Sequence, residues 1–183
     1  MKNNSEAGFS YIDVMIAVVI LLVGILALVS AISGAIFQAK GQEQQLNAKQ
    51  IATSTMESIM SVKETSDPVR LGWNSVGNVG SNPNAAGVNQ GIFVTGFQHV
   101  TTGAGADQVI GTADDDGAIV DGFQRQIIIR DECDPERRSY NCSPAGGLAV
   151  RIRSVEITVN YFVGAIQRQE VLTTVLTDYA VTN

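Results

Sequence analysis

The residue types best suited to binding chemistry gather in one loop, residues 101–117, which is rich in aspartate and glycine. Its carboxylates are Asp107, Asp114, Asp115 and Asp116. Calcium takes about six to eight oxygen ligands, and glycines let backbone carbonyls turn toward an ion. The spacing does not follow the EF-hand pattern, which needs a distal glutamate. Two interpretations therefore stay open: a calcium site formed by these four aspartates, or an acidic, solvated loop.

No other constellation in the sequence predicts catalysis, so we expect a protein that is not an enzyme. The single histidine, His99, has no Gly-x-Ser-x-Gly elbow to accompany it. No Gly-x-x-x-x-Gly-Lys-Ser/Thr loop is present to hold phosphates, and the glycines of 103–111 do not lie between a strand and a helix. Calcium at the acidic loop is the one cofactor that the sequence suggests.

The charge balance argues against nucleic acid as a partner. The net charge is -6 and the pI is about 4.7, whereas binding to phosphates is driven by basic residues. Arginines 137 and 138, and arginines 151 and 153, have many acids nearby in the sequence. We therefore interpret them as solvated or ion-paired, and we expect no binding of nucleic acid.

A long apolar segment dominates the first part of the chain. No residue from Val14 to Phe37 is charged, and about 24 residues of helix span roughly 36 Å, more than a bilayer core of about 30 Å. The apolar region of a signal peptide is shorter, about 7–15 residues. One acid, Asp13, precedes the segment, and a polar leader from Met1 to Gly8 comes before it. An acid at this end of a helix is favoured by the macrodipole.

Residues 8–13, with the sequence Gly-Phe-Ser-Tyr-Ile-Asp, resemble the processing site of the type IV pilin superfamily. That family has a glycine, an aromatic residue or methionine, two or three small or apolar residues and a glutamate before a long apolar helix. Residues 20–28 and 48–59 are similar to the PilV-type minor pilins in particular. The resemblance covers roughly the first third of the chain, and Asp13 stands where the family usually has glutamate.

The resemblance implies how the chain is processed. A prepilin peptidase would cut between Gly8 and Phe9 and methylate the new amine of Phe9. Asp13 would then face the Phe9 amine of a neighbouring subunit, which would offset the cost of a carboxylate at the membrane boundary.

The resemblance also implies a location and partners. The protein would span the inner membrane once with its head in the periplasm, and would then enter a pilus at the cell surface. Its partners would be the membrane, other pilin subunits, the prepilin peptidase and the inner-membrane assembly platform. It would serve as a minor pilin that joins or initiates the filament. The alternatives are a type II secretion pseudopilin and a membrane-anchored periplasmic binding domain that does not polymerise.

With the head outside the cytoplasm, the only two cysteines are predicted to form a Cys133–Cys142 disulfide. Closing a loop of this size stabilises by about 2–3 kcal/mol in the chain-entropy view. A redox-active pair usually has the closer Cys-x-x-Cys spacing. We therefore expect a structural bridge.

Beyond the apolar segment, helical spacing continues to about Val62. One apolar stripe recurs at intervals of three and four and is expected to pack against the head; it comprises Ala48, Ile51, Ala52, Met56, Ile59 and Met60. Asp67-Pro68 is expected to end the helical stretch. The predicted organisation is a leader at 1–8, a hydrophobic helix at 9–37, an amphipathic helix half at 38–66 and a globular head at 67–183.

The remainder of the chain reads as strands and loops. Strands are predicted at 91–100, 123–130, 149–153, 155–161 and 168–177, the last two joined at Gly164-Ala165 as an antiparallel hairpin. Residues 127–129, all isoleucine, are expected to be buried on both faces, and Trp73 is expected to anchor the core. The fold class is α+β and pilin-like: a long N-terminal helix packed on a small antiparallel sheet of four or five strands.

Overall fold

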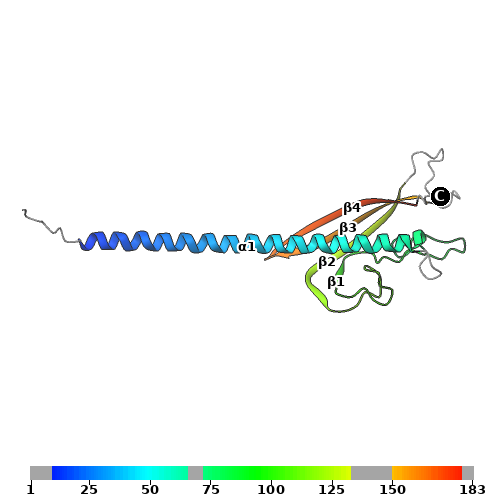
Figure 1. Cartoon of the computed structure of the whole chain (residues 1–183), viewed down its shortest axis with the longest axis horizontal. Coiled ribbons are helices and arrows are strands. Elements are labelled where there is room, and N and C mark those ends of the chain that lie inside the picture. Colours follow the sequence, from blue (N-terminus) through cyan, green and yellow to red (C-terminus); the bar gives the residue numbers. More distant parts are fainter. Residues whose placement is uncertain (1–9, 66–71, 133–149, 179–183) are drawn as a thin grey trace, which may run out of the picture. The chain divides into compact units, whose positions relative to one another are not determined.

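The computed structural model describes residues 10–65, 72–132 and 150–178. The elements are α1 (Tyr11–Glu64), the 3-10 helix η1 (Gly72–Ser75), β1 (Gln98–Thr101), β2 (Ile119–Glu132), β3 (Ile152–Val163) and β4 (Ile166–Thr177). Figure 1 labels the long helix and the four strands. A long helix and an antiparallel sheet confirm the α+β class. The chain divides into two compact units, Met1–Gln42 and Glu43–Asn183, and α1 contributes to both.

Helix α1 begins with one of the two hydrogen bonds of a capping box. The carboxylate of Asp13 accepts a hydrogen bond from the backbone N–H of Ser10 at 3.3 Å, and the carbonyl of Ser10 accepts the first helical bond, from the N–H of Asp13. The helix has 54 residues. Its described end at Glu64 lies just before Asp67-Pro68, as the proline predicts, although that dipeptide itself lies outside the described residues.

The head holds one four-stranded antiparallel sheet in the order β1-β2-β3-β4. Strands β2 and β3 pair from Phe123↔Tyr161 to Glu132↔Ile152, and β3 and β4 pair as a hairpin closed at Val163↔Ile166. The predicted hairpin is confirmed. The strand predicted at 91–100 is wrong over most of its length, because β1 holds only four residues and, within 91–97, only Phe93 forms an isolated bridge.

The core of the head lies between the last turns of α1 and the inner face of the sheet. Of the predicted stripe, Ala48, Ala52, Met56 and Ile59 are buried. Met60 was expected in the stripe but is 49% exposed, whereas Thr55 and Val62 are buried in the same face. The helical period of 3.6 residues brings positions 55, 59 and 62 onto the side where 56 also lies, and turns position 60 away.

The expectation of burial on both faces of β2 is wrong. Ile127 is 3% exposed, but Ile128 and Ile129 are only partly buried. Ile128 pairs with Glu156 and Arg130 with Ser154 across β3, so the outer face carries polar and charged groups. Alternation along β2 instead points Phe123, Arg125 and Ile127 toward the core.

The segment after α1 is tied to the sheet by polar side chains. The amide of Asn78 donates to the carbonyl of Ile127 at 2.9 Å and accepts from the N–H of Ile129 at 2.8 Å, so it pairs with the edge of β2 beyond the end of β1. Trp73 packs partly buried against the core, as predicted, and its indole N–H donates to the carbonyl of Val150 at 2.7 Å.

Candidate functional site

The first candidate site is the apolar surface of α1. Its most apolar window of 18 residues has a mean hydropathy of 3.1, and none of that window is buried within the chain. Leu26, for example, is 69% exposed. Monomeric soluble proteins rarely expose apolar surface on this scale, and large exposed apolar patches are typical of surfaces that contact a membrane or another protein. By length and composition the helix can cross a membrane.

Asp13 stands at the head of this surface and points back to the helix start. Its side chain bonds to the Ser10 amide, and its residue is exposed. Within a single chain it therefore acts as the helix N-terminal acid, the structural interpretation that the sequence allowed. Pairing with a neighbouring subunit's amine stays a prediction. Gly8 and Phe9, the predicted processing residues, lie outside the described residues.

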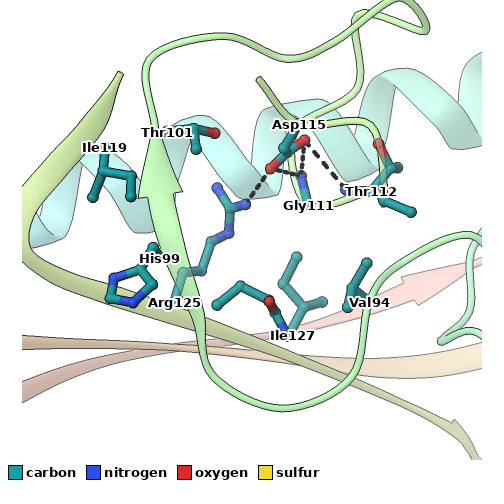
Figure 2. A pocket seen from close by; sticks show the side chains of 11 residues that line it. Val94, His99, Thr101, Gly111, Thr112, Asp115, Ile119, Arg125 and Ile127 are labelled. Atoms are coloured by element: carbon teal, nitrogen blue, oxygen red, sulfur yellow. Dashed lines mark hydrogen bonds and ion pairs between the residues drawn. The ribbon is translucent and has the colours of Figure 1, made fainter. Parts of the chain in front are cut away.

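The second candidate site is a pocket in the head with a volume of about 400 Å³ (Figure 2). Strands β1 and β2, the acidic loop and the segment before β1 all contribute to it. Its lining comprises Val94, Gln98, His99, Thr101, Gly111, Thr112, Ala113, Asp115, Ile119, Arg125 and Ile127. A cavity of this size is typical of sites for small molecules.

A buried ion pair forms one wall of this pocket. Nη2 of Arg125 donates to Oδ2 of Asp115 at 2.7 Å, and the two side chains are 4% and 12% exposed. Nη1 of Arg125 donates a long bond of 3.4 Å to the hydroxyl of Thr55 on α1. Figure 2 shows the guanidinium pointing at Asp115 between the two sides of the pocket. The pair thus links β2, the acidic loop and the helix.

The acidic loop is held by hydrogen bonds to its own aspartates. Asp115 accepts from the backbone N–H of Gly111 at 3.0 Å and of Thr112 at 3.3 Å. Asp107 accepts from the N–H of Val109 at 2.7 Å. Gly111 has a φ of 100°, a conformation that residues with a side chain rarely adopt, and its turn aims the N–H at Asp115. The loop therefore has a structural role that needs no ion.

The bonds to Asp114 also affect its ionisation. The hydroxyl of Thr112 donates to it at 2.7 Å, and the N–H groups of Ala106 and Asp107 donate at 2.9 and 3.1 Å. These donors, the Thr112 hydroxyl first, lower the pKa of Asp114 below its ordinary value of 3.8, because they favour the charged form.

The geometry of the acidic loop does not provide a cluster of ligands for calcium. Within residues 10–65, 72–132 and 150–178, no group of three or more His, Cys, Asp or Glu side chains is placed to hold a metal ion. Asp107, Asp114 and Asp115 each direct oxygens at N–H or hydroxyl donors. Asp116 is exposed, at the turn where its backbone pairs with Gly103. Calcium binding stays a prediction.

Other predicted residues lie outside the described part of the chain. Cys133 and Cys142 belong to the undescribed segment 133–149, so the disulfide stays a prediction. The same segment holds arginines 137 and 138. Arg151 is exposed, and Arg153 is buried and ion-paired with Asp131 at 2.9 Å. For Arg153 the interpretation as an ion-paired residue is confirmed.

Sequence reasoning missed the Arg125–Asp115 pair. Arg125 occurs between Phe123 and Ile127 at the spacing of one strand face, which is the signal that would have placed its charge inside. Asp115 carried a signal too, but its neighbours in the acidic loop suggested an ion rather than a guanidinium. No sequence rule sets which of the loop's four aspartates meets an arginine of the strand that follows.

No protein-family model, no curated protein and no solved structure matches the chain.

Proposed function

We propose that this protein is a pilin-like subunit of a type IV filament, of the minor pilin kind. The observation that carries the proposal is the apolar surface of α1, which is charge-free from Val14 to Phe37 and is not covered by any of the residues that the structure describes. It is supported by the resemblance of residues 8–13 to a prepilin processing site.

The proposed work of the protein is mechanical. Stored in a bilayer, the apolar surface of α1 contacts acyl chains; in a filament it contacts the same surface of other subunits. Both environments are apolar, so the transfer changes packing rather than the exposure of the helix to water. The glycines of this part, Gly24 and Gly34, have nothing within 4 Å of an added Cβ, which leaves room on the helix for the close approach of a partner.

Asp13 has two roles in this proposal. In the membrane-bound subunit its carboxylate caps α1 through Ser10. In the filament it pairs with the Phe9 amine that processing creates on a neighbouring subunit. The amine is charged, so this pairing adds an attraction between opposite charges that the bond to the uncharged Ser10 N–H lacks, and assembly favours the exchange. Aspartate is one methylene shorter than the glutamate usual in the family, which requires a closer approach of the two chains.

Processing provides the decisive test. In the native host, the mass of the intact protein should correspond to a chain that begins at Phe9 and carries one added methyl group. Gly8→Val should give an uncut precursor that is missing from sheared filaments, because a side chain prevents close approach of the backbone to the peptidase. Gly24→Val serves as the matched control, since it replaces a helix glycine in open space and should leave the cut unchanged.

Two results of this test contradict the proposal. One is recovery of wild-type protein that still carries Met1. The other is a Gly8→Val chain that enters sheared filaments as well as the wild type.

A second candidate function is a membrane-anchored binding domain that does not polymerise. The observation that favours it is the 400 Å³ pocket in the head, which filament assembly does not use. This candidate predicts that Gly8→Val leaves function intact and that the protein never co-purifies with filaments. A type II secretion pseudopilin predicts the same processing as a minor pilin, and is distinguished by whether the subunit is found in pili or is required for secretion.

A further inference from the structure

The head pocket contains a buried charge whose hydrogen-bonding capacity is not used up. A guanidinium has five N–H donors, and Arg125 uses one for Asp115 and one for Thr55. Among the described residues, its other donors, including Nε–H, have no protein acceptor. Every fully buried side-chain nitrogen and oxygen of those residues has a partner. Nε of Arg125 must therefore be reached by solvent, and Arg125 lines the pocket.

The acceptors in the same wall are already occupied. Oδ1 of Asp115 receives the N–H groups of Gly111 and Thr112, and Oδ2 receives Gly111 again and Arg125. The negative charge of Asp115 is thus offset on both oxygens. What the pair offers to the pocket is a set of unused donors on a positively charged group. Such a wall selects a ligand that brings acceptor atoms.

The rest of the lining mixes polar side chains, from Gln98, His99, Thr101 and Thr112, with apolar ones. Val94 and Ile127 line the pocket, and Ile119, which is 57% exposed, lies at its rim. Figure 2 shows Ile119 and His99 on the side of the pocket opposite Val94. An exposed isoleucine beside a polar cavity provides contact for an aliphatic body. The pocket thus combines one buried cationic donor with apolar contacts, the composition usual for a small-molecule site.

We propose that this pocket binds a small organic carboxylate with an aliphatic body. The carboxylate accepts hydrogen bonds from the unused N–H groups of Arg125, and the body contacts Ile119 and Ile127. A carboxylate suits the guanidinium better than a neutral carbonyl does, because the hydrogen bonds are charge-assisted and two oxygens fit the planar donor group. All these residues belong to the head, so the proposal is independent of filament assembly.

Binding can be measured on the full-length protein in detergent micelles with 4-methylpentanoate as the probe. The chain has one histidine, and it lines the pocket, so the ring signals of His99 in an NMR spectrum report on this site alone. Titration should shift these signals to saturation. The matched neutral amide, 4-methylpentanamide, should bind at least about tenfold more weakly, because it lacks the charge.

Two variants locate the binding. Arg125→Lys keeps a positive charge beside Asp115 but loses the planar donor group, and should weaken 4-methylpentanoate binding about tenfold or more. Ile119→Glu places a negative charge at the exposed rim without disturbing the core, and should weaken binding to a similar extent. Its matched control is Val171→Glu on β4, which is 50% exposed. This variant adds the same charge outside the pocket lining and should change the affinity less than about twofold.

Several results would overturn the proposal. These are His99 signals that do not respond to 4-methylpentanoate, equal affinities for the acid and the amide, or equal losses in Ile119→Glu and Val171→Glu. If Arg125→Lys does not fold, as shown by loss of the thermal transition of Trp73 fluorescence, Ile119→Glu and its control alone decide the outcome.

Discussion

Two buried arginines stand on neighbouring strands of the head, and they are used differently. Arg153 on β3 donates from Nε to Asp131 at 2.9 Å and from Nη1 to the carbonyls of Trp73 and Val76, while its guanidinium lies 4.5 Å from the centre of the Trp73 ring. Arg125 on β2 has one close acceptor and one distant one. Both side chains are 4% exposed, so burial alone does not separate them.

The two arginines differ in the groups that surround the guanidinium and accept its hydrogen bonds. Around Arg153 the protein supplies a carboxylate, two backbone carbonyls and an aromatic face, and these fasten the segment of η1 to the sheet. Around Arg125 the protein supplies Asp115 and leaves an open pocket on the other side. A buried charge is costly unless it is paired and hydrogen-bonded. Arg153 is therefore a structural arginine, whereas Arg125 keeps donors available for a ligand or for water.

The largest effect is expected from Arg153→Met. The change leaves the carbonyls of Trp73 and Val76 without their donor and separates Asp131 from its partner, so we expect a loss of about 3 kcal/mol in the free energy of unfolding. The only tryptophan of the chain is Trp73, so urea unfolding followed by its fluorescence reports directly on this region. The control is Arg130→Met, whose side chain is 56% exposed and paired with Glu156 at 3.6 Å; it should cost less than about 0.5 kcal/mol. Equal losses would remove the distinction between the two kinds of arginine.

Asp115→Asn should have a smaller effect at the other arginine. The amide oxygen can still accept from Gly111 and Thr112, but Arg125 loses its charged acceptor. Water can enter the pocket and solvate the guanidinium, so we expect a loss of about 1–2 kcal/mol rather than the larger cost of a sealed site. Asp121→Asn removes the same charge at an exposed position of β2 and should cost less than about 0.5 kcal/mol. A loss from Asp115→Asn as large as that from Arg153→Met would show that the Arg125 site is closed to water.

The sequence predicted the helix and strands that carry these residues better than it predicted the contacts between their side chains. Helical spacing predicted most of the buried face of α1 because each turn repeats at short range, and the alternation of residues 155–161 predicted most of β3 in the same way. The partners of Arg153 are on η1, at Val76 just after it and on β2, and those of Arg125 are on α1 and the acidic loop. Such contacts join residues far apart in the chain, so no local pattern encodes them.

The acidic loop also shows that the sequence does not reveal which groups contact each other. Four aspartates among glycines suggested a metal ion, because composition reports which atoms are present but not what they face. In the fold, Asp115 faces a guanidinium and backbone N–H groups, and Asp114 faces the Thr112 hydroxyl and two N–H groups. The pocket beside them was not predicted at all, since it forms where four separate segments meet.

Thr55→Val tests whether the link between α1 and Arg125 matters. The hydroxyl of Thr55 accepts from Arg125 at 3.4 Å and donates to the carbonyl of Ile51 at 2.7 Å. Valine has nearly the same shape and buries an apolar group, and the bond to Arg125 is long, so the loss should be about 1 kcal/mol or less. Thr53→Val, at an exposed position of the same helix, is the control for the effect of valine on helix stability. A loss near that of Asp115→Asn would mean that Thr55 is a principal partner of Arg125.

The smallest expected effect is on how strongly the stability of the protein depends on pH in the acid range. The pKa of Asp114 is lowered in the fold, first by the hydroxyl of Thr112 and then by backbone N–H groups. A lowered pKa means that this carboxylate contributes stability above its unfolded pKa of 3.8, and that the contribution is lost as the pH falls through the lower folded value. Asp114→Asn has no such charge to lose. The difference in Tm between about pH 5 and about pH 3, followed by Trp73 fluorescence, should therefore be smaller in Asp114→Asn than in the wild type.

Thr112→Val keeps the carboxylate of Asp114 but removes its first hydrogen-bond donor, and should reduce the difference in Tm part of the way. An equal pH difference in Asp114→Asn and the wild type would mean that these hydrogen bonds do not favour the charged carboxylate.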